Sequence, residues 1–268
     1  MVQRLEWTGD LIAKFWDGVA QTPLSDRSFA GSAAAAVADI ATRFMPSGAQ
    51  CLDFGGGNGE LCEELLRRGL RAAIYEPSRG HGQQVERRLD GRPGFLGLNP
   101  AGEQIFDAVF CLEVYEHVPD AVMPGFLAQL ASLVRPGGLL LLTTPNQEDL
   151  DANGVYCPTC DSYFHRWQHL RSVEPEHLLH TMAQAGFSCR WLGLVGFETP
   201  EKVRHLARTG LRGPWWRRAA RWARDDLGLP LPGAAKPVLA DQRAVDITLG
   251  TESNIVYVGE RMSQERPA

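Results

Sequence analysis

The stretch LDFGGGNGE, residues 52–60, decides the fold. Apolar residues before it predict a short strand over 49–54, and a helical pattern follows over 60–68. Glycines allow tight backbone turns and let a ligand approach the main chain closely. A glycine-rich loop that leaves a strand and opens a helix is typical of nucleotide-cofactor sites in α/β folds. The predicted cofactor-binding residues of this loop are Gly55, Gly57, Asn58 and Gly59.

Acidic residues stand at both ends of this loop. Asp53 lies at the end of the predicted strand, where open α/β sheets bind ligands, and Glu60 opens the helix. A dinucleotide site would direct the helix N-terminus at a pyrophosphate, whereas acids there suit a cationic ligand better. The next strand, expected over 72–75, ends in Glu76, whose carboxylate can accept hydrogen bonds from both ribose hydroxyls. Asp53 and Glu76 are therefore predicted to bind the cofactor.

Strands and helices alternate along the rest of the chain. This alternation predicts a mostly parallel seven-stranded sheet with helices on both faces. Residues 1–48 are expected to form a helical N-terminal cap, and residues 49–268 the main domain. Within that domain, residues 145–170 are interpreted as an irregular polar segment. The further predicted strands cover 95–98, 108–112, 139–143, 187–194 and 255–258, and the further helices 127–134 and 177–185.

Composition excludes several classes of protein. The net charge of −5 gives no overall basic field for nucleic acid. The first 17 residues carry acids and no apolar core, unlike a secretory signal, and the longest apolar run, near 139–142, is too short to span a bilayer. Six cysteines in 268 residues do not suggest a disulfide scaffold. We therefore expect a cytoplasmic protein, with core thiols at Cys51, Cys62 and Cys111.

Two carboxylates and an imidazole follow the fourth predicted strand, in EVYEHVPD at 113–120. A histidine at the carboxyl end of a strand beside the cofactor loop can act as a general base near neutral pH, which makes His117 a candidate. Glu113, Glu116 and His117 could also bind a divalent metal. Alternatively, the pair at 116–117 only caps the strand and lines the cofactor pocket. The three residues are the candidate catalytic set.

These motifs together resemble the class I S-adenosylmethionine-dependent methyltransferases, roughly over residues 48–195 and more weakly over 254–259. The resemblance implies a Rossmann-like fold and S-adenosylmethionine as the cofactor. It also implies that the glycine loop faces the cofactor's amino-acid part and that Glu76 holds the ribose. The place of the family's adenine-side residue is taken by Asn99, and Leu112 and Glu113 are added to the predicted cofactor site. The residues that carry the resemblance are 52–59, Glu76, 106–109, 113–117 and 133–145.

The segment 113–117 resembles two groups within that class. One is the ubiquinone-pathway O-methyltransferases. The other is the small-RNA 3′-end 2′-O-methyltransferases, whose ExxEH motif and a later histidine hold a magnesium ion. Here Glu113, Glu116 and His117 match ExxEH, and His165 or His169 would be the later histidine.

A second candidate metal site is YCPTCDSYFHRWQH at 156–169, with the spacing C-x2-C-x4-H-x3-H. Zinc prefers four tetrahedral Cys and His ligands, and the segment resembles a zinc knuckle. We predict a zinc-binding loop over 153–171, with both histidines on one helix face. Unliganded surface thiols or a redox pair are alternatives, and one mixed site that also uses Glu116 and His117 stays open. The predicted zinc ligands are Cys157, Cys160, His165 and His169.

The predicted reaction is methyl transfer from the cofactor to a hydroxyl of a small molecule or sugar. A first alternative is metal-dependent methylation at an RNA 3′ end, against which the acidic net charge argues. A second is a non-catalytic, cofactor-binding regulatory scaffold that a bound zinc ion stabilises. An Arg- and Trp-rich insertion at 200–240 could contact a membrane surface or an anionic substrate, but a solvated helical cover is favoured. The oligomeric state is left open.

Overall fold

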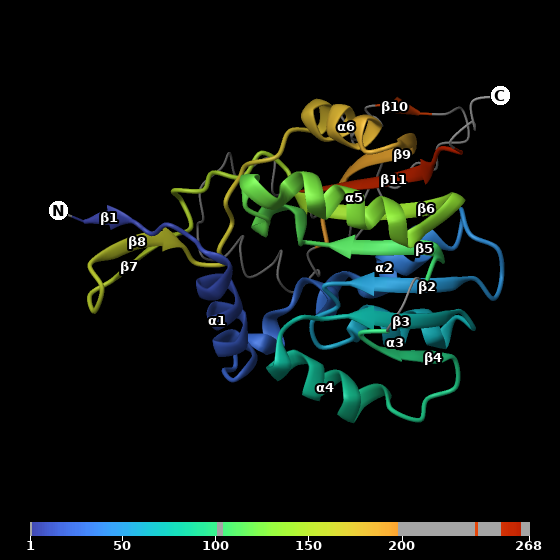
Figure 1. Cartoon of the computed structure of the whole chain (residues 1–268), viewed down its shortest axis with the longest axis horizontal. Coiled ribbons are helices and arrows are strands. Elements are labelled where there is room, and N and C mark those ends of the chain that lie inside the picture. The colour runs from blue at the N-terminus through green and yellow to red at the C-terminus, as the bar shows by residue number, and fades with distance from the viewer. Residues whose placement is uncertain (1, 101–103, 198–238, 241–252, 264–268) are drawn as a thin grey trace, which may run out of the picture.

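The computed structural model describes residues 2–100, 104–197, 239–240 and 253–263, and its centre is a twisted sheet (Figure 1). The strand order is β10-β9-β11-β6-β5-β2-β3-β4. Apart from the two-residue edge strand β10 (Leu239–Ala240), seven strands make up this sheet. They are β2 (Gln50–Phe54), β3 (Arg71–Tyr75), β4 (Phe95–Leu98), β5 (Phe106–Leu112), β6 (Val134–Pro145), β9 (Phe187–Val195) and β11 (Asn254–Arg261).

The pairing confirms the predicted mostly parallel sheet. Strands β4, β3, β2, β5 and β6 pair in parallel, and β11 enters antiparallel between β6 and β9. Because the five parallel strands point the same way, the loops that follow them meet at one edge. The functional site is therefore sought at the carboxyl ends of β2 to β6.

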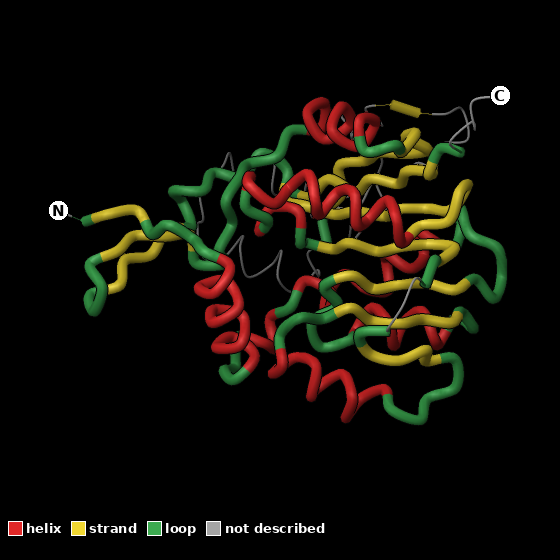
Figure 2. The backbone as a smooth tube through the Cα atoms, viewed as in Figure 1, coloured by secondary structure: helices red, strands yellow, loops and turns green. Residues whose placement is uncertain are grey.

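Helices cover both faces of the sheet (Figure 2). Side chains alternate across the strands, so Ala72 and Ile74 face one core and Ala73 faces the other. The first core includes buried side chains of α2, α3 and α4, and the second those of α5 and α6. The helices are α1 (Gly9–Ala20), α2 (Phe29–Ala41), α3 (Glu60–Arg67), α4 (Arg79–Leu89), α5 (Met123–Leu133) and α6 (Pro175–Gln184).

Two helices, α1 and α2, lie in the N-terminal region for which a helical cap is predicted. Ser28 caps α2 by accepting a hydrogen bond from the backbone N–H of Gly31, and the alanine-rich face of α2 packs close to α3. Thr8 caps α1 in the same way, through the N–H of Leu11. Helix α1 lies against α4, near the carboxyl edge of the sheet. The boundary at residue 48 stays a prediction.

A small second sheet corrects the prediction of an irregular segment at 145–170. Strands β7 (Gly154–Cys157) and β8 (Ser162–His165) form an antiparallel hairpin, and β1 (Gln3–Arg4) pairs in parallel with β8. The segment is rich in aromatic residues, which favour strands. Trp7 packs edge-on against Phe164 and Phe15, which joins this sheet to α1.

The predicted insertion at 200–240 lies outside the described residues, except for β10. In the part of the chain that is described, no helix is long and apolar enough to cross a membrane. Cytoplasmic localisation stays a prediction.

Candidate active site

The glycine loop turns sharply away from the end of β2. Gly55, Gly57 and Gly59 have φ values of +77°, +52° and +81°, which side-chain-bearing residues rarely adopt. A Cβ on Gly55 would lie 2.7 Å from Cγ2 of Val114, in the segment that follows β5. The glycine loop and the end of β5 are therefore in direct contact.

Two buried polar side chains of this loop have oxygen atoms without hydrogen-bond partners in the described structure. They are Oδ2 of Asp53 and Oδ1 of Asn58. Burial, with the nearby Glu60 and Glu76, raises the pKa of Asp53 to about 8. The Asn58 amide donates from Nδ2 to the carbonyl of Ser25, which leaves its oxygen available. These two oxygens are acceptors, so the partner they need is a hydrogen-bond donor or a cation. The ammonium group of an amino-acid ligand is both.

Glu76, the predicted ribose-binding acid, directly follows β3, and two backbone N–H groups hold its carboxylate. Its Oε2 accepts from the N–H of Gly57 at 2.9 Å, and its Oε1 accepts from the N–H of Ser78 at 2.7 Å. Burial raises its pKa to about 7, although these hydrogen bonds act in the opposite direction. Asn99, predicted near adenine, brackets the Glu76 backbone: its Oδ1 accepts from the N–H and its Nδ2 donates to the carbonyl. Asn99 thus positions the acid.

Glu113 directly follows Leu112 at the end of β5, with φ of +50°. Its carboxylate accepts hydrogen bonds from Oγ1 of Thr143 at 2.8 Å and from Nδ2 of Asn254 at 3.2 Å. Burial raises its pKa to about 7, and both hydrogen bonds oppose that shift. The carboxylate is thus held by β6 and β11, apart from the candidate ligand groups found among the described residues. This corrects the predicted metal trio of Glu113, Glu116 and His117.

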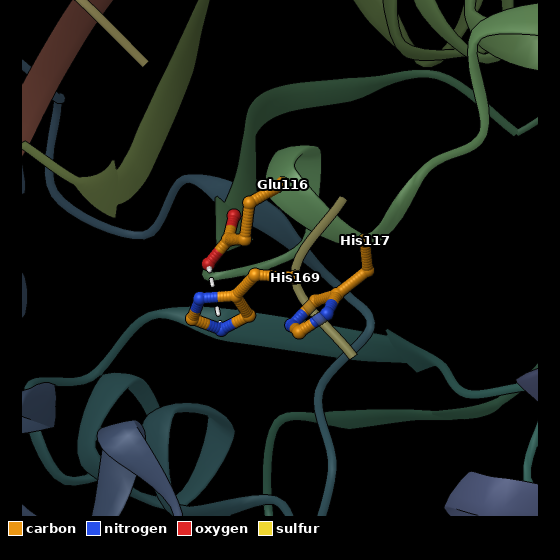
Figure 3. Close-up of side chains that lie close together, drawn as sticks. All are labelled: Glu116, His117 and His169. Carbon is orange, nitrogen blue, oxygen red and sulfur yellow. Dashed lines mark ion pairs between the residues drawn. The ribbon is translucent and has the colours of Figure 1, made fainter. Parts of the chain in front are cut away.

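Glu116 and His117, which follow in the same segment, lie close to His169, a residue far along the chain. Glu116, His117 and His169 place one ligand atom each within 4.8 Å of one another (Figure 3). Glu116 is fully buried: its Oε2 accepts from Oγ1 of Thr144, while its Oε1 has no hydrogen-bond partner and lies 4.0 Å from Nε2 of His169. Burial and the neighbouring Glu113 raise the pKa of Glu116 well above its ordinary value.

Hydrogen bonds fix which nitrogen of each histidine is free. Nδ1 of His117 lies 3.4 Å from the carbonyl oxygen of Gln168, which can only accept, so Nδ1 carries the hydrogen. Nδ1 of His169 is hydrogen-bonded to Oε2 of Glu148 and is the donor for the same reason. Both histidines therefore keep an unshared pair on Nε2. Burial and the nearby His169 lower the pKa of His117 to about 3, which keeps that ring neutral.

A second group, Glu148, His165 and His169, is also compact but differs chemically. Nδ1 of His165 accepts from the backbone N–H groups of Trp167 and His169, so its hydrogen sits on Nε2, 3.3 Å from Oε1 of Glu148. Burial would raise the pKa of Glu148, but hydrogen bonds from His169 and Asn153 hold it below its usual value. This group is a hydrogen-bonded support, whereas the first group offers three unshared pairs.

The predicted zinc ligands do not meet, which corrects the zinc-loop prediction. The hairpin pairs Cys157 with Ser162 but Gly154 with His165, so the chain runs back along β8 instead of forming a helix. At about 3.3 Å per residue, His165 lies roughly 10 Å from the hairpin tip. Cys157 and Cys160 stay at the tip, and both histidines join the buried clusters described above.

Several residues of the site were not predicted from the sequence. Nε1 of Trp16, on α1, donates to Oε1 of Gln168, whose Nε2 donates to the carbonyl of His117. The Trp16 ring also packs edge-on against His117, with 5.0 Å between centroids. Glu148 could have been found as an acid soon after a parallel strand's carboxyl end. Trp16, Gln168 and Asn254 carry no local signal of their roles.

Comparisons with known proteins show the family to which the chain belongs. A family model described as "Methyltransferase domain" matches residues 27–219. The ubiquinone biosynthesis O-methyltransferase of Xanthomonas axonopodis pv. citri is 37% identical over 119 residues, covering 40% of this chain and 48% of that protein. The chain thus spans about half the length of the curated relatives it matches.

Solved structures extend the similarity at the level of the fold. The 1,6-didemethyltoxoflavin-N1-methyltransferase of Burkholderia thailandensis, bound to S-adenosylhomocysteine, has a TM-score of 0.58 at 14% identity, covering 98% of this chain and 94% of that one. The [4+2]-cyclase SpnF has a TM-score of 0.52 at 19% identity, covering 94% and 93%. One fold thus carries different reactions among these neighbours, and the site must decide between them.

Proposed function

Because this chain belongs to the methyltransferase-domain family, among the class I S-adenosylmethionine-dependent methyltransferases, we propose that it methylates a hydroxyl oxygen of a small molecule or sugar. The observation that carries the proposal is the group Glu116, His117 and His169. It follows β5 in a segment that contacts the glycine loop at Val114 and Gly55. A base beside the donor is what a hydroxyl requires, because an oxygen must lose its proton when it accepts a methyl group.

The residues of the glycine loop fit S-adenosylmethionine. When bound, this cofactor supplies a methyl group on a positively charged sulfur. Asp53 and Asn58 offer buried, unpartnered oxygens to its ammonium group, and Glu76 offers carboxylate lone pairs to its ribose. The N-terminal region covers this site, since Asn58 donates to Ser25 and the Ser78 hydroxyl donates to Asp17 of α1. Helix α1 thus helps exclude water from the reacting groups.

We assign proton removal to His169, with Glu148 as its positioning residue. The carboxylate of Glu148 holds Nδ1–H, aims Nε2 at the site and stabilises the positive charge that the ring gains with a proton. His117, with a pKa of about 3, is too weak a base for this step. Its neutral Nε2 instead accepts a hydrogen bond and helps orient the acceptor.

An acceptor screen tests the proposal. Purified protein would be incubated with S-adenosylmethionine and matched sets of phenols, sugars, amines and thiols, and formation of S-adenosylhomocysteine measured. We expect turnover with hydroxyl compounds and none with their O-methylated counterparts. Turnover confined to amines or thiols would contradict the oxygen assignment. Cofactor binding without turnover on any set would favour the non-catalytic scaffold.

A second candidate is metal-dependent methylation, favoured by the three unshared pairs of Glu116, His117 and His169. Two histidines and one carboxylate are a recurrent donor set for divalent transition metals, and each ring donates its other N–H to a carbonyl or carboxylate, as metal-bound histidines do. A cation held there would lower the pKa of an acceptor hydroxyl. Diols, including an RNA 3′ end, are the acceptors such a site would suit, although the charge of −5 opposes RNA.

Metal content separates the two candidates. Elemental analysis would compare wild type with Glu116→Gln, using Glu176→Gln on exposed α6 as the matched control. About one metal per chain that is lost only in Glu116→Gln, with activity restored by adding the ion to stripped protein, would establish the metal candidate. Full activity after chelation would leave His169 as the unaided base.

A further inference from the structure

Two free cysteines stand at the tip of the β7–β8 hairpin. Cys157 ends β7, and Cys160 is exposed in the turn that leads to β8. Asp161 takes a left-handed φ of +54° there and accepts a hydrogen bond from the Tyr156 hydroxyl at 2.7 Å, which braces the turn. Figure 1 shows the hairpin projecting away from the main sheet. The thiols are therefore displayed at an outer end of the molecule.

The hairpin turn brings the two thiols together in one short segment. Cys157 pairs with Ser162 across the hairpin, so residues 158–161 form the turn that carries Cys160. Two cysteines with this CxxC spacing can offer two thiolates to one metal ion.

The tip supplies only half of a zinc site. A structural zinc takes four ligands, but among the described residues these two thiols join no group of three or more candidate ligands. Of the other cysteines, three are buried in the main sheet and its helices, and Cys189 lies on β9. The nearest histidines along the chain serve the active-site clusters. Two further ligands are needed, and an identical tip on a second molecule offers two thiolates.

We propose that Cys157 and Cys160 bind one zinc ion jointly with the same two cysteines of a second copy of this chain. A two-fold axis through the ion would bring two identical tips together and complete four thiolate ligands. Val155 and Tyr156, which precede Cys157, are 38% and 51% exposed, so apolar surface is available to pack beside the ion. This zinc is independent of the proposed methyl transfer and links two active sites in one particle.

Zinc stoichiometry and molecular mass test the proposal on the full chain. Protein purified without tags would be loaded with zinc and analysed by elemental mass spectrometry and by light scattering after size-exclusion chromatography. We expect 0.5 zinc per chain in a dimer that a chelator converts to monomers. Cys157→Ser and Cys160→Ser should lose both zinc and dimer, whereas Cys189→Ser, the matched control, should keep them. Cobalt in place of zinc should give the intense absorption of a tetrathiolate site at half an equivalent per chain.

Several results would overturn the proposal. They are one zinc per chain in a monomer, a dimer that persists in both tip variants and after chelation, and tip cysteines that form an intrachain disulfide and bind no zinc. Thiol counting with and without reductant detects the disulfide. Binding of S-adenosylhomocysteine by the tip variants shows that they are folded, so a loss of zinc in them reports on the tip itself.

Discussion

The glycine loop and the histidine cluster lie at the same edge of the sheet but are built in opposite ways. The loop, residues 53–59, relies on backbone conformation and on buried oxygens that await a ligand. The histidine cluster is defined as Glu116, His117, Glu148, Gln168 and His169. Within it, hydrogen bonds to Gln168 and Glu148 fix which nitrogen of each histidine ring is free. We therefore expect changes in the loop to act on cofactor affinity, and changes in the cluster to act on turnover.

The largest effect is expected from Asp53→Asn. The buried carboxylate is the loop's partner for a cation, and a charge-assisted hydrogen bond contributes up to about 3 kcal/mol, so cofactor affinity should fall about 100-fold. Calorimetric titration with S-adenosylmethionine measures this, with Asp90→Asn on the surface as the control. Unchanged affinity would remove Asp53 from the cofactor site.

Asp53→Asn should also change how the free energy of unfolding depends on pH. The pKa of Asp53 is about 8 in the folded chain against 3.8 for an ordinary aspartate, so between these values the folded state holds a proton that the unfolded state has lost. The free energy of unfolding should therefore fall as pH rises from 4 to 8, by at most about 1.4 kcal/mol per pH unit. Denaturant titrations of unliganded protein should show a weaker decline in Asp53→Asn. At pH 8 the variant should be the more stable protein.

In the histidine cluster, His169→Ala should lower kcat by about 10²- to 10⁴-fold, the usual contribution of a general base, and leave cofactor affinity within a few-fold. His180→Ala, on the exposed side of α6, is the control. Steady-state kinetics with the acceptor found in the screen would measure kcat. If His169→Ala weakened only cofactor binding and left kcat unchanged, the loop and the cluster would not differ in the way proposed.

Gly55→Ala tests the contact between the regions. The new methyl group would meet the Val114 side chain at 2.7 Å on a backbone with φ of +77°, so the glycine loop or the segment that leads from Val114 into the cluster must shift. We expect about a tenfold loss in both cofactor affinity and kcat. Gly137→Ala has a similar φ of +71° but open space around it, so it should lower only the melting temperature. Equal kinetics in both variants would mean that backbone strain alone matters.

The smallest effect is expected from Trp16→Phe. It keeps an aromatic ring beside His117 but removes the N–H that donates to Gln168, so the KM for the acceptor should rise a few-fold. Trp7→Phe is matched, because Trp7 packs on Phe15 and Phe164 through its ring. A larger effect from Trp7 would show that α1 acts through packing alone.

The two regions also differ in how far the sequence predicts them. The loop and Glu76 follow from strand ends that a parallel sheet must bring to one edge, and the main sheet is predicted for the same reason. The histidine cluster depends on a hairpin whose short strands carry a weak pattern, and on a hydrogen bond between Trp16 and Gln168, 152 residues apart. The zinc prediction failed because spacing along the chain says nothing about the direction in which a hairpin returns. Helix α4 was missed because its polar sequence buries only a few side chains against the sheet.

Strand β11 has a consequence for how the protein is made. It lies between β6 and β9, and its first residue, Asn254, holds the carboxylate of Glu113. During synthesis, β9 has no neighbour on that side until residues 254–261 leave the ribosome. The nascent chain must keep an open gap in its sheet while the intervening residues are translated, and Glu113 gains its amide partner only when that gap closes.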